Sequence, residues 1–553
     1  MNYRFSLQIF YLFGSIVFVA GCGGRGLQGA AAPPLEPPAP ARAAAAPLRR
    51  LTSEQYRHSV RDLLAVSTEG IQLPLDEGTA GFFANTLAPV SELQLEQYAR
   101  AAETIARAAA AQLPALAARL GPCAAGEGDE ICADRFIERF GRKVYRRPLR
   151  PDERLPLHEL YAGGRKVAGP AEGFKQVVQA LLSSPHFLYL VEAVPPAAAD
   201  PARRRAPPVA PVAPYALSAR LAYFLWGSAP DEGLLEAAGA GRLGSLAGLR
   251  DETVRMMKDE RFRDTLASFH LQWLDLTELS GVEKRNKIYP LFTPALRAAM
   301  QEETVRFVDH VVRQDDGRLE TLLTGRYSLL GEGLFELYGM GAQTGAAAAW
   351  RKVDLGPLHR AGLLSQASFL TAHAHWDKPS LVLRGKTIRE RLLCTDLPPP
   401  PPDVNNTPPP FDPKVSMRER FEDHRSEVSC ARCHRLIDPL GIPFESYDAI
   451  GALRTMDGPA PVDPSSELSG TAHSDGPVKD AQELAARLAG SDEVRDCLVL
   501  QWFRYALGRD VGAADAPSLT QLRRIFRESG NRVPTLIAAI PSTDSFRYVE
   551  AAP

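Results

Sequence analysis

The stretch Leu51-Thr-Ser-Glu-Gln-Tyr-Arg-His-Ser-Val-Arg-Asp-Leu-Leu64 sets the fold class, because it carries the signals of a complete amphipathic helix. Thr52 has a hydroxyl that can cap the first turn, and Gln55 follows three residues later, which is a capping-box arrangement. Leu63 and Leu64 continue the apolar face of the same segment. We therefore predict a capped helix at this position.

The same helical spacing of apolar residues recurs through most of the chain, whereas strand-like alternation is scarce. Further helices are predicted at residues 92–120, 136–145, 173–191, 218–226, 246–276, 293–313, 363–372, 416–428, 481–488, 494–507 and 519–527. Two Pro-rich stretches interrupt the pattern: residues 195–214 are predicted to form a linker and residues 397–413 an extended polyproline strap. The predicted fold is all-α, with several helical blocks and long Pro-rich connections.

The composition is that of an ordinary multi-domain globular protein. The 553 residues are 45% hydrophobic and 24% charged, and their formal net charge is −2. This near-zero net charge argues against a general nucleic-acid binder, which would carry a basic face. Only one segment, at the N-terminus, is apolar enough to approach a membrane span, which excludes a multi-pass transporter.

Residues 1–21 contain an apolar run that ends in small residues, as in a secretory signal peptide. Cys22 follows directly, and the sequence Val-Ala-Gly-Cys at residues 19–22 resembles a bacterial lipobox in which the cysteine is lipidated. Gly23 is not the aspartate that commonly retains lipoproteins at the inner membrane. Residues 22–48 are rich in Ala and Pro and are predicted to form a tether. We expect an exported outer-membrane lipoprotein that faces the periplasm or the cell surface; the alternative is a plain signal peptide with an incidental cysteine.

Six cysteines besides Cys22 would lie in an oxidising compartment, where pairing is expected. Cys123 and Cys132 flank a short acidic loop and are predicted to form a local disulfide. Cys430 and Cys433 belong to a distinct motif described below. Cys394 and Cys497 remain and could form a bridge, an assignment made by elimination alone.

The motif Cys430-Ala-Arg-Cys433-His434 is the attachment pattern of c-type haem. One helical turn would present both thiols to the vinyl groups of a porphyrin, and His434 would be the proximal iron ligand. We expect its second ring nitrogen to be held by a backbone carbonyl in the loop around Pro439. The alternatives are a disulfide between Cys430 and Cys433, or a zinc site that adds a distant ligand to this motif.

The sixth iron ligand is the open question, since it separates an electron carrier from a catalyst. Met456 follows His434 by 22 positions in a Gly/Asp-bounded loop, and a thioether ligand would raise the reduction potential. His424 could supply a second imidazole and a lower potential, and His473 is a third candidate. An open sixth position would permit chemistry on small molecules.

A second pattern, His373-Ala-His375 near Asp377, is compatible with a metal site. Two histidines alone are a weak signal, and a polar loop after a helix is the simpler interpretation. The tryptophans Trp226, Trp273, Trp350 and Trp502 are most simply core residues, with a sugar-stacking platform as the alternative.

Taken in order, these blocks resemble the large secreted cytochrome-like proteins of planctomycetes and myxobacteria, which are assembled from planctomycete-cytochrome-c-type and associated domains of unknown function. The resemblance rests on residues 51–64, 145–149 (Tyr-Arg-Arg-Pro-Leu), 217–231, 438–441 (Asp-Pro-Leu-Gly) and 505–509 (Tyr-Ala-Leu-Gly-Arg). It implies helical modules at residues 49–121, 122–194 and 215–345, a linker at 195–214, a small cytochrome-c-like module with the Cys-x-x-Cys-His motif at 346–465, and a helical module at 466–553. It also implies a redox-related, exported protein, without indicating a substrate.

These observations predict an exported, lipid-anchored protein with one covalent haem c that passes electrons to or from a redox partner in the envelope. Because the chain has a single Cys-x-x-Cys-His motif, conduction through several haems within the chain is excluded. Two alternatives stay open: a haem enzyme with an open sixth site that oxidises an extracellular substrate, and a haem-free surface-binding protein stapled by disulfides. Whether the protein is an enzyme is therefore not decided by the sequence.

Overall fold

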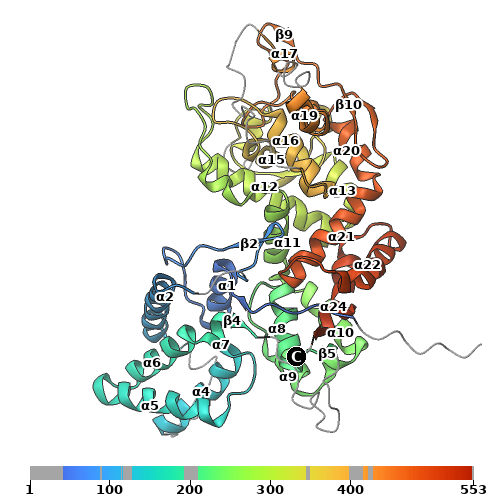
Figure 1. Ribbon diagram of the computed structural model, residues 1–553. Helices are drawn as coiled ribbons and strands as arrows, with labels where there is room; N and C mark the ends of the chain where they lie inside the picture. The colour runs from blue at the N-terminus through green and yellow to red at the C-terminus, as the bar shows by residue number, and fades with distance from the viewer. Residues whose placement is uncertain are drawn as a thin grey trace, which may run out of the picture. The chain divides into compact units, whose positions relative to one another are not determined.

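The computed structural model describes residues 42–86, 90–113, 115, 128–191, 209–343, 345, 349–397, 415–420 and 428–550. Helices dominate these residues, and their strands form six two-stranded antiparallel sheets. The prediction of a mostly α-helical fold is confirmed (Figure 1). Within the described ranges, no helix is both long and apolar enough to cross a bilayer.

The first helical group begins at the capping box expected from the sequence. Thr52 Oγ1 accepts a hydrogen bond from the backbone N–H of Gln55 at 3.2 Å, and the N–H of Thr52 donates to Gln55 Oε1 at 3.2 Å. The group shares one hydrophobic core, which includes Phe136, Phe140 and Phe187. Its elements are α1 (Ser53–Leu64), α2 (Glu92–Ala111), α4 (Asp129–Val144), α5 (Pro151–Ala168), α6 (Pro170–Ser183) and α7 (Pro185–Leu188), with strands β1 (Arg49–Arg50) paired to β4 (Tyr189–Leu190) and β2 (Gly78–Thr79) paired to β3 (Phe82–Phe83).

The middle of the chain departs from the prediction at residues 246–276, which do not form one helix. The break lies at Asp259, whose carboxylate accepts from the backbone N–H of Arg261 at 3.0 Å and so competes with the helical hydrogen-bond pattern. The elements here are β5 (Val209–Pro211), α8 (Pro214–Leu225), α9 (Glu232–Gly239), η2 (Arg242–Gly244), α10 (Leu246–Met257), α11 (Phe262–Trp273), η3 (Thr277–Gly281), α12 (Pro294–Arg313), α13 (Leu319–Thr324), β6 (Tyr327–Leu330), α14 (Leu334–Leu337), β7 (Arg351–Asp354) and η5 (Gly356–Leu358).

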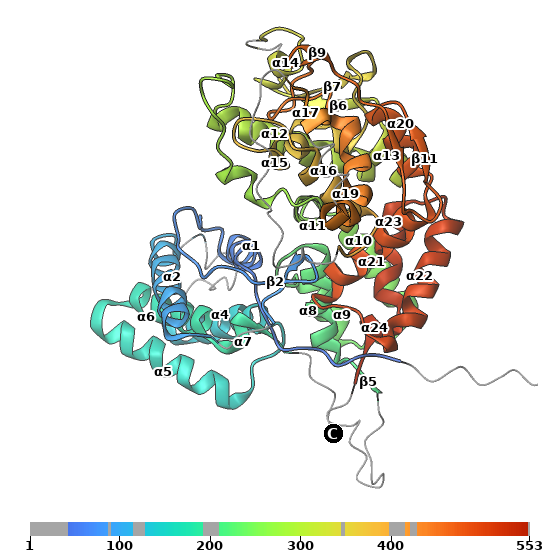
Figure 2. The same cartoon turned by 45° about the horizontal axis from the view of Figure 1, so that its top comes forward.

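The last third contains the motif helix α19 (Val428–Gly441), which lies beside α16 (Leu381–Thr387) in both views (Figure 1, Figure 2). Before it come η6 (Leu363–Ser365), α15 (Ala367–Ala372), the π-helical turn η7 (Ile388–Leu392) and α17 (Met417–Arg420). After it come η8 (Ile442–Phe444), β8 (Met456–Asp457), β9 (Ala460–Pro461), β10 (Ser466–Leu468), β11 (Gly476–Val478), α20 (Ala481–Ala489), α21 (Asp492–Leu507), η9 (Ala513–Asp515), α22 (Ala516–Glu528), α23 (Val533–Ala539), η10 (Ile540–Ser542), α24 (Asp544–Arg547) and β12 (Tyr548–Glu550). Most of the predicted polyproline strap lies outside the described residues.

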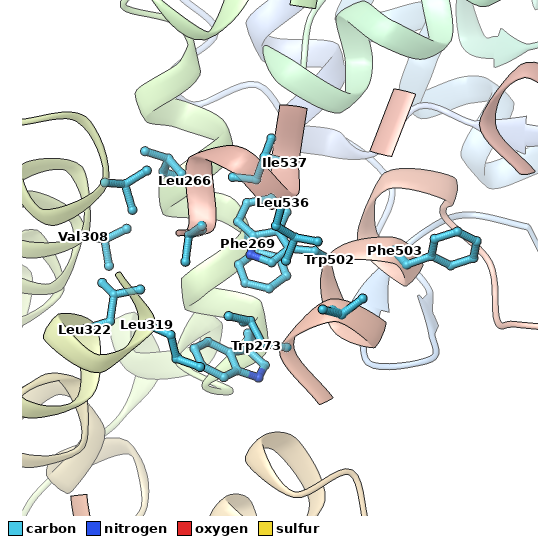
Figure 3. Packing of buried hydrophobic residues seen from close by; sticks show 14 of the residues in the cluster. Leu266, Phe269, Trp273, Val308, Leu319, Leu322, Trp502, Phe503, Leu536 and Ile537 are labelled. Atoms are coloured by element: carbon cyan, nitrogen blue, oxygen red, sulfur yellow. The ribbon is translucent and has the colours of Figure 1, made fainter. Parts of the chain in front are cut away.

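The main hydrophobic core joins segments that are far apart in the chain. Figure 3 shows Phe269 and Trp273 of α11 beside Trp502 of α21, with Leu319 and Leu322 of α13 facing the same cluster. The rings of Phe269 and Trp502 are stacked, with their centroids 3.7 Å apart. Trp226, Trp273 and Trp502 are fully buried, so their predicted place in the core is confirmed.

Residues Ala41–Pro553 form one compact unit, and its core continues across the predicted module boundaries. Strand β12 pairs with β5, bringing Tyr548 opposite Pro211 across more than half of the chain. The predicted modules are therefore packed against one another. The helix that carries the motif, α19, belongs to the same compact unit and contributes Leu440 to the main core.

Candidate functional site

Helix α19 places the three motif residues on one side of a single turn. Cys430, Cys433 and His434 stand at positions i, i+3 and i+4, which are neighbours on a helix surface. Both cysteines are partly exposed, and the side chain of His434 is 17% exposed. The structure thus gives this part of the motif the local geometry that covalent haem attachment requires.

The second ring nitrogen of His434 has a different partner from the one we predicted. Its Nδ1 lies 2.9 Å from Oδ1 of Asp438, one helical turn further along α19. The expected backbone carbonyl in a loop around Pro439 is wrong, because the helix does not end before the proline but continues to Gly441. Continuing the helix brings the i+4 carboxylate alongside the imidazole instead.

Asp438 is deeply buried, with 1% of its side chain exposed. Its second oxygen, Oδ2, has no hydrogen-bond partner among the described residues. A buried carboxylate is costly unless a donor or a positive charge compensates it, and His434 is the compensating group that the structure places against it. A metal-bound histidine commonly donates its other N–H to such a carboxylate. The residues present therefore fit an iron ligand at Nε2 of His434.

Two glycines allow α16 and α19 to approach closely. A Cβ atom added to Gly385 would overlap the carbonyl oxygen of Ile437, and one added to Gly441 would overlap the carbonyl oxygen of Leu381. Neither position leaves room for any side chain. The position of α19, and with it the motif, is thus fixed by backbone contact with α16.

Two buried arginines hold the segments around α19. Arg384 donates to the backbone carbonyls of Phe444 (2.8 Å) and Asp448 (2.7 Å), while Arg389 donates to those of Leu436 (2.7 Å) and Gly470 (2.7 Å). Burial lowers the pKa of Arg384 to about 10. These hydrogen bonds tie the backbone around α19 to α16 and η7.

The structure places the candidate sixth ligands as follows. Met456 lies in β8 of a short hairpin and is 50% exposed. The hairpin is held by Arg454, which bridges Glu445 at 2.6 Å and Asp457 at 3.0 Å. His473 is exposed, and His424 lies outside the described residues. A sixth-ligand role for Met456 or His424 stays a prediction.

A disulfide joins Cys394 to Cys497, the two cysteines that elimination left as a pair. It connects the end of the π-helical turn η7 with α21 and has a Cα–Cα distance of 5.5 Å. Cys132 is disulfide-bonded as well. Its expected partner Cys123, and the lipidation site Cys22, lie outside the described residues.

The histidine pair does not form a metal site. His373 is buried, and its Nε2 lies 2.9 Å from the carbonyl oxygen of Leu274 while its Nδ1 lies 3.2 Å from Oγ1 of Thr387. Burial lowers its pKa to about 4. Across the ranges that the structure describes, no group of three or more His, Cys, Asp and Glu side chains could hold a metal ion, so the zinc alternative has no support there either.

A polar cluster where α1, α11 and α21 meet gave no sequence signal. Ser268 donates to the carboxylate of Glu54 at 2.6 Å, although 214 positions separate them, and the N–H of Phe83 donates to Oε1 of Gln272 at 2.6 Å. His58, Asp264 and Tyr505 line the same small cavity. Burial raises the pKa of Glu54. The cluster connects three of the predicted modules, and no local pattern could have revealed contacts over such separations.

Comparison with known families assigns most of the chain to five domains, each described as a protein of unknown function. In chain order they are DUF1587 (residues 49–111), DUF1595 (132–192), DUF1592 (212–340), DUF1588 (360–457) and DUF1585 (475–546). The DUF1588 model, which carries the label PSCyt3, contains the motif helix. Nothing matches among the curated proteins or among the solved structures.

Proposed function

Because the chain belongs to the family of planctomycete cytochrome-c-associated proteins, we propose that it is an electron-transfer protein with one covalently attached c-type haem. The family supports a cytochrome-like role in general terms. The finer assignment is carried by one observation: Cys430, Cys433 and His434 share one face of α19, with His434 hydrogen-bonded to a buried carboxylate.

Each residue of this site has a defined role in the proposal. The sulfurs of Cys430 and Cys433 form thioethers with the porphyrin, and Nε2 of His434 binds the iron. Haem bound in this way supplies a one-electron Fe(III)/Fe(II) couple. Both cysteines are partly exposed, so the porphyrin is attached at a helix face within reach of a partner. The electron would come from a donor protein in the envelope and leave to an acceptor of the same kind.

We propose further that the protein is exported and anchored by a lipid at Cys22 in the outer membrane. The Cys394–Cys497 disulfide supports an oxidising compartment, since such bonds persist outside the cytosol. Covalent haem attachment also takes place outside the cytoplasm, so the two proposals are mutually consistent.

A haem enzyme with an open sixth position is the second candidate. It is favoured by the half-exposed position of Met456, which leaves the sulfur in a surface hairpin. Rapid binding of CO to the reduced protein would support the enzyme, whereas an electron carrier with a firm sixth ligand would bind CO slowly or not at all.

The test of the main proposal is the reduced pyridine haemochrome spectrum of the mature protein, expressed in a periplasm that contains the haem c maturation machinery. We expect a c-type band in the native protein and its loss in the double variant Cys430→Ala/Cys433→Ala. The double variant Cys394→Ser/Cys497→Ser is the matched control, because it removes two cysteines outside the motif and should keep the band. A native protein without a band would refute the proposal and favour a haem-free, disulfide-stapled binding protein.

A further inference from the structure

We infer that Asp438 is a positioning residue that lowers the reduction potential of the iron bound by His434. This inference rests on the proposed function, since it concerns the same haem. It goes beyond the attachment motif, because the Cys-x-x-Cys-His pattern itself says nothing about what holds the second nitrogen of the histidine.

The first step is geometric. In the 2.9 Å contact between Nδ1 of His434 and Oδ1 of Asp438, the nitrogen donates when the carboxylate is ionised, because an ionised carboxylate can only accept. The proton is therefore on Nδ1, and Nε2 is the nitrogen that presents its lone pair to a metal. Both residues belong to α19, which is fixed against α16 by the close approach at Gly385 and Gly441, so this arrangement is built into the fold.

The second step concerns charge. Asp438 is 1% exposed, and among the described residues its one ion-pair partner is His434. In such a dry position a carboxylate interacts with nearby charges far more strongly than it would in water. Its negative charge makes the imidazole a more electron-rich ligand, which stabilises Fe(III) over Fe(II). A backbone carbonyl, the partner we had predicted, carries no net charge and would have a weaker effect.

The third step concerns the buried cations on the supporting elements. Arg384 of α16 and Arg389 of η7 are buried and donate to backbone carbonyls, and among the described residues neither forms an ion pair with Asp438. Both arginines are retained in a variant that changes residue 438 alone. A variant that neutralises only Asp438 therefore isolates its contribution.

The experiment is a spectroelectrochemical titration of the haem-loaded protein and of Asp438→Asn, which keeps the size and one acceptor oxygen but removes the charge. We expect the haemochrome band to be retained and the equilibrium constant for one-electron reduction to increase at least tenfold, which corresponds to about 59 mV. The control is Asp463→Asn, the same change at an exposed residue paired with Arg418 in the same module. Its equilibrium constant should change less than twofold.

The outcomes separate this inference from the proposed function. A native protein without a haemochrome band refutes the proposed function itself. A band in both proteins with equal potentials overturns the inference about Asp438 alone. If the Asn variant does not fold, Asp438→Ser is titrated in the same way; failure of both neutral variants to fold, judged by circular dichroism, would show that Asp438 has a structural role and would likewise overturn the inference.

Discussion

The protonation state of the buried His373 follows from the groups around its two ring nitrogens. Leu274 offers only a carbonyl oxygen at 2.9 Å, so Nε2 of His373 carries a proton. Nδ1 lies 3.2 Å from Oγ1 of Thr387, whose hydroxyl donates to the carbonyl oxygen of Leu383. A second proton, at Nδ1, would place a positive charge in a buried site. Burial accordingly lowers the pKa of His373 to about 4, below its usual value near 6.5.

This shift predicts a loss of stability in acid. Between pH 6.5 and 4 the unfolded chain binds a proton that the folded chain does not, so the free energy of unfolding falls as the pH decreases through this window. At one pKa unit per 1.36 kcal/mol, His373 should account for about 2–3 kcal/mol of that loss. Urea unfolding of His373→Gln at pH 7 and pH 4.5 would show this as a destabilised variant at pH 7 whose deficit shrinks in acid.

The exposed His473 provides the comparison for this measurement. Its substitution by Gln makes the same chemical change outside the buried site. If His373→Gln lost as much stability between the two pH values as the native protein, the buried imidazole would not be the source of the acid sensitivity.

Secondary-structure elements could be predicted from the sequence wherever their signals are local. The capping box at Thr52 and Gln55 identified the start of α1, and helical spacing identified most of the other helices. Prediction from local sequence signals failed where an element depends on residues far apart in the chain, or where two local signals favour different structures. Pro439 indicated a loop, yet α19 continues past it to Gly441, and the pairing of β12 with β5 depends on residues that are far apart in the chain.

The candidate site likewise contains residues that the sequence could predict and residues that it could not. The residues of the motif were predictable, because Cys430, Cys433 and His434 are contiguous and their spacing has a chemical meaning. The supporting residues were not, since the carboxylate of Asp438 becomes a partner only when the helix is known to continue. The contact of α16 with α19 depends on a backbone approach that no local pattern describes.

Gly385 provides a test of that approach at the level of two helices. Replacing it by Ala would press a methyl group against the carbonyl oxygen of Ile437, a backbone atom that cannot move without shifting α19. We expect Gly385→Ala to lower the free energy of unfolding by about 1–3 kcal/mol, the usual range for overpacking. The yield of attached haem should fall as well, because the motif moves with the helix.

Gly163 is the matched control, since it also lies within a helix, α5, and a Cβ atom there would meet nothing within 4 Å. Gly163→Ala should increase the free energy of unfolding by up to about 1 kcal/mol, because alanine favours the helix over glycine. Guanidinium unfolding measures both variants. Equal behaviour of the two would mean that α16 and α19 are not held by backbone contact.

At the scale of the whole molecule, the motif lies inside a loop that is closed by a covalent bond. Cys394 and Cys497 are 103 positions apart, and α19, with the motif, lies between them. The bond ties the region before α19 to α21, whose Trp502 is stacked on Phe269 in the main core. The region that carries the motif is thus connected to the rest of the fold both by packing and by a crosslink.

Loop-closure entropy gives the size of this contribution. A crosslink that closes about 100 residues should stabilise the folded chain by up to about 4–5 kcal/mol, by restricting the unfolded state. We expect the double variant Cys394→Ser/Cys497→Ser to show a lower midpoint of guanidinium unfolding, and the native protein to approach the same midpoint after reduction. Reduction should have no further effect on the variant's midpoint if this disulfide dominates. A double variant as stable as the native protein would instead mean that packing around Phe269 and Trp502 alone holds the region of the motif in place.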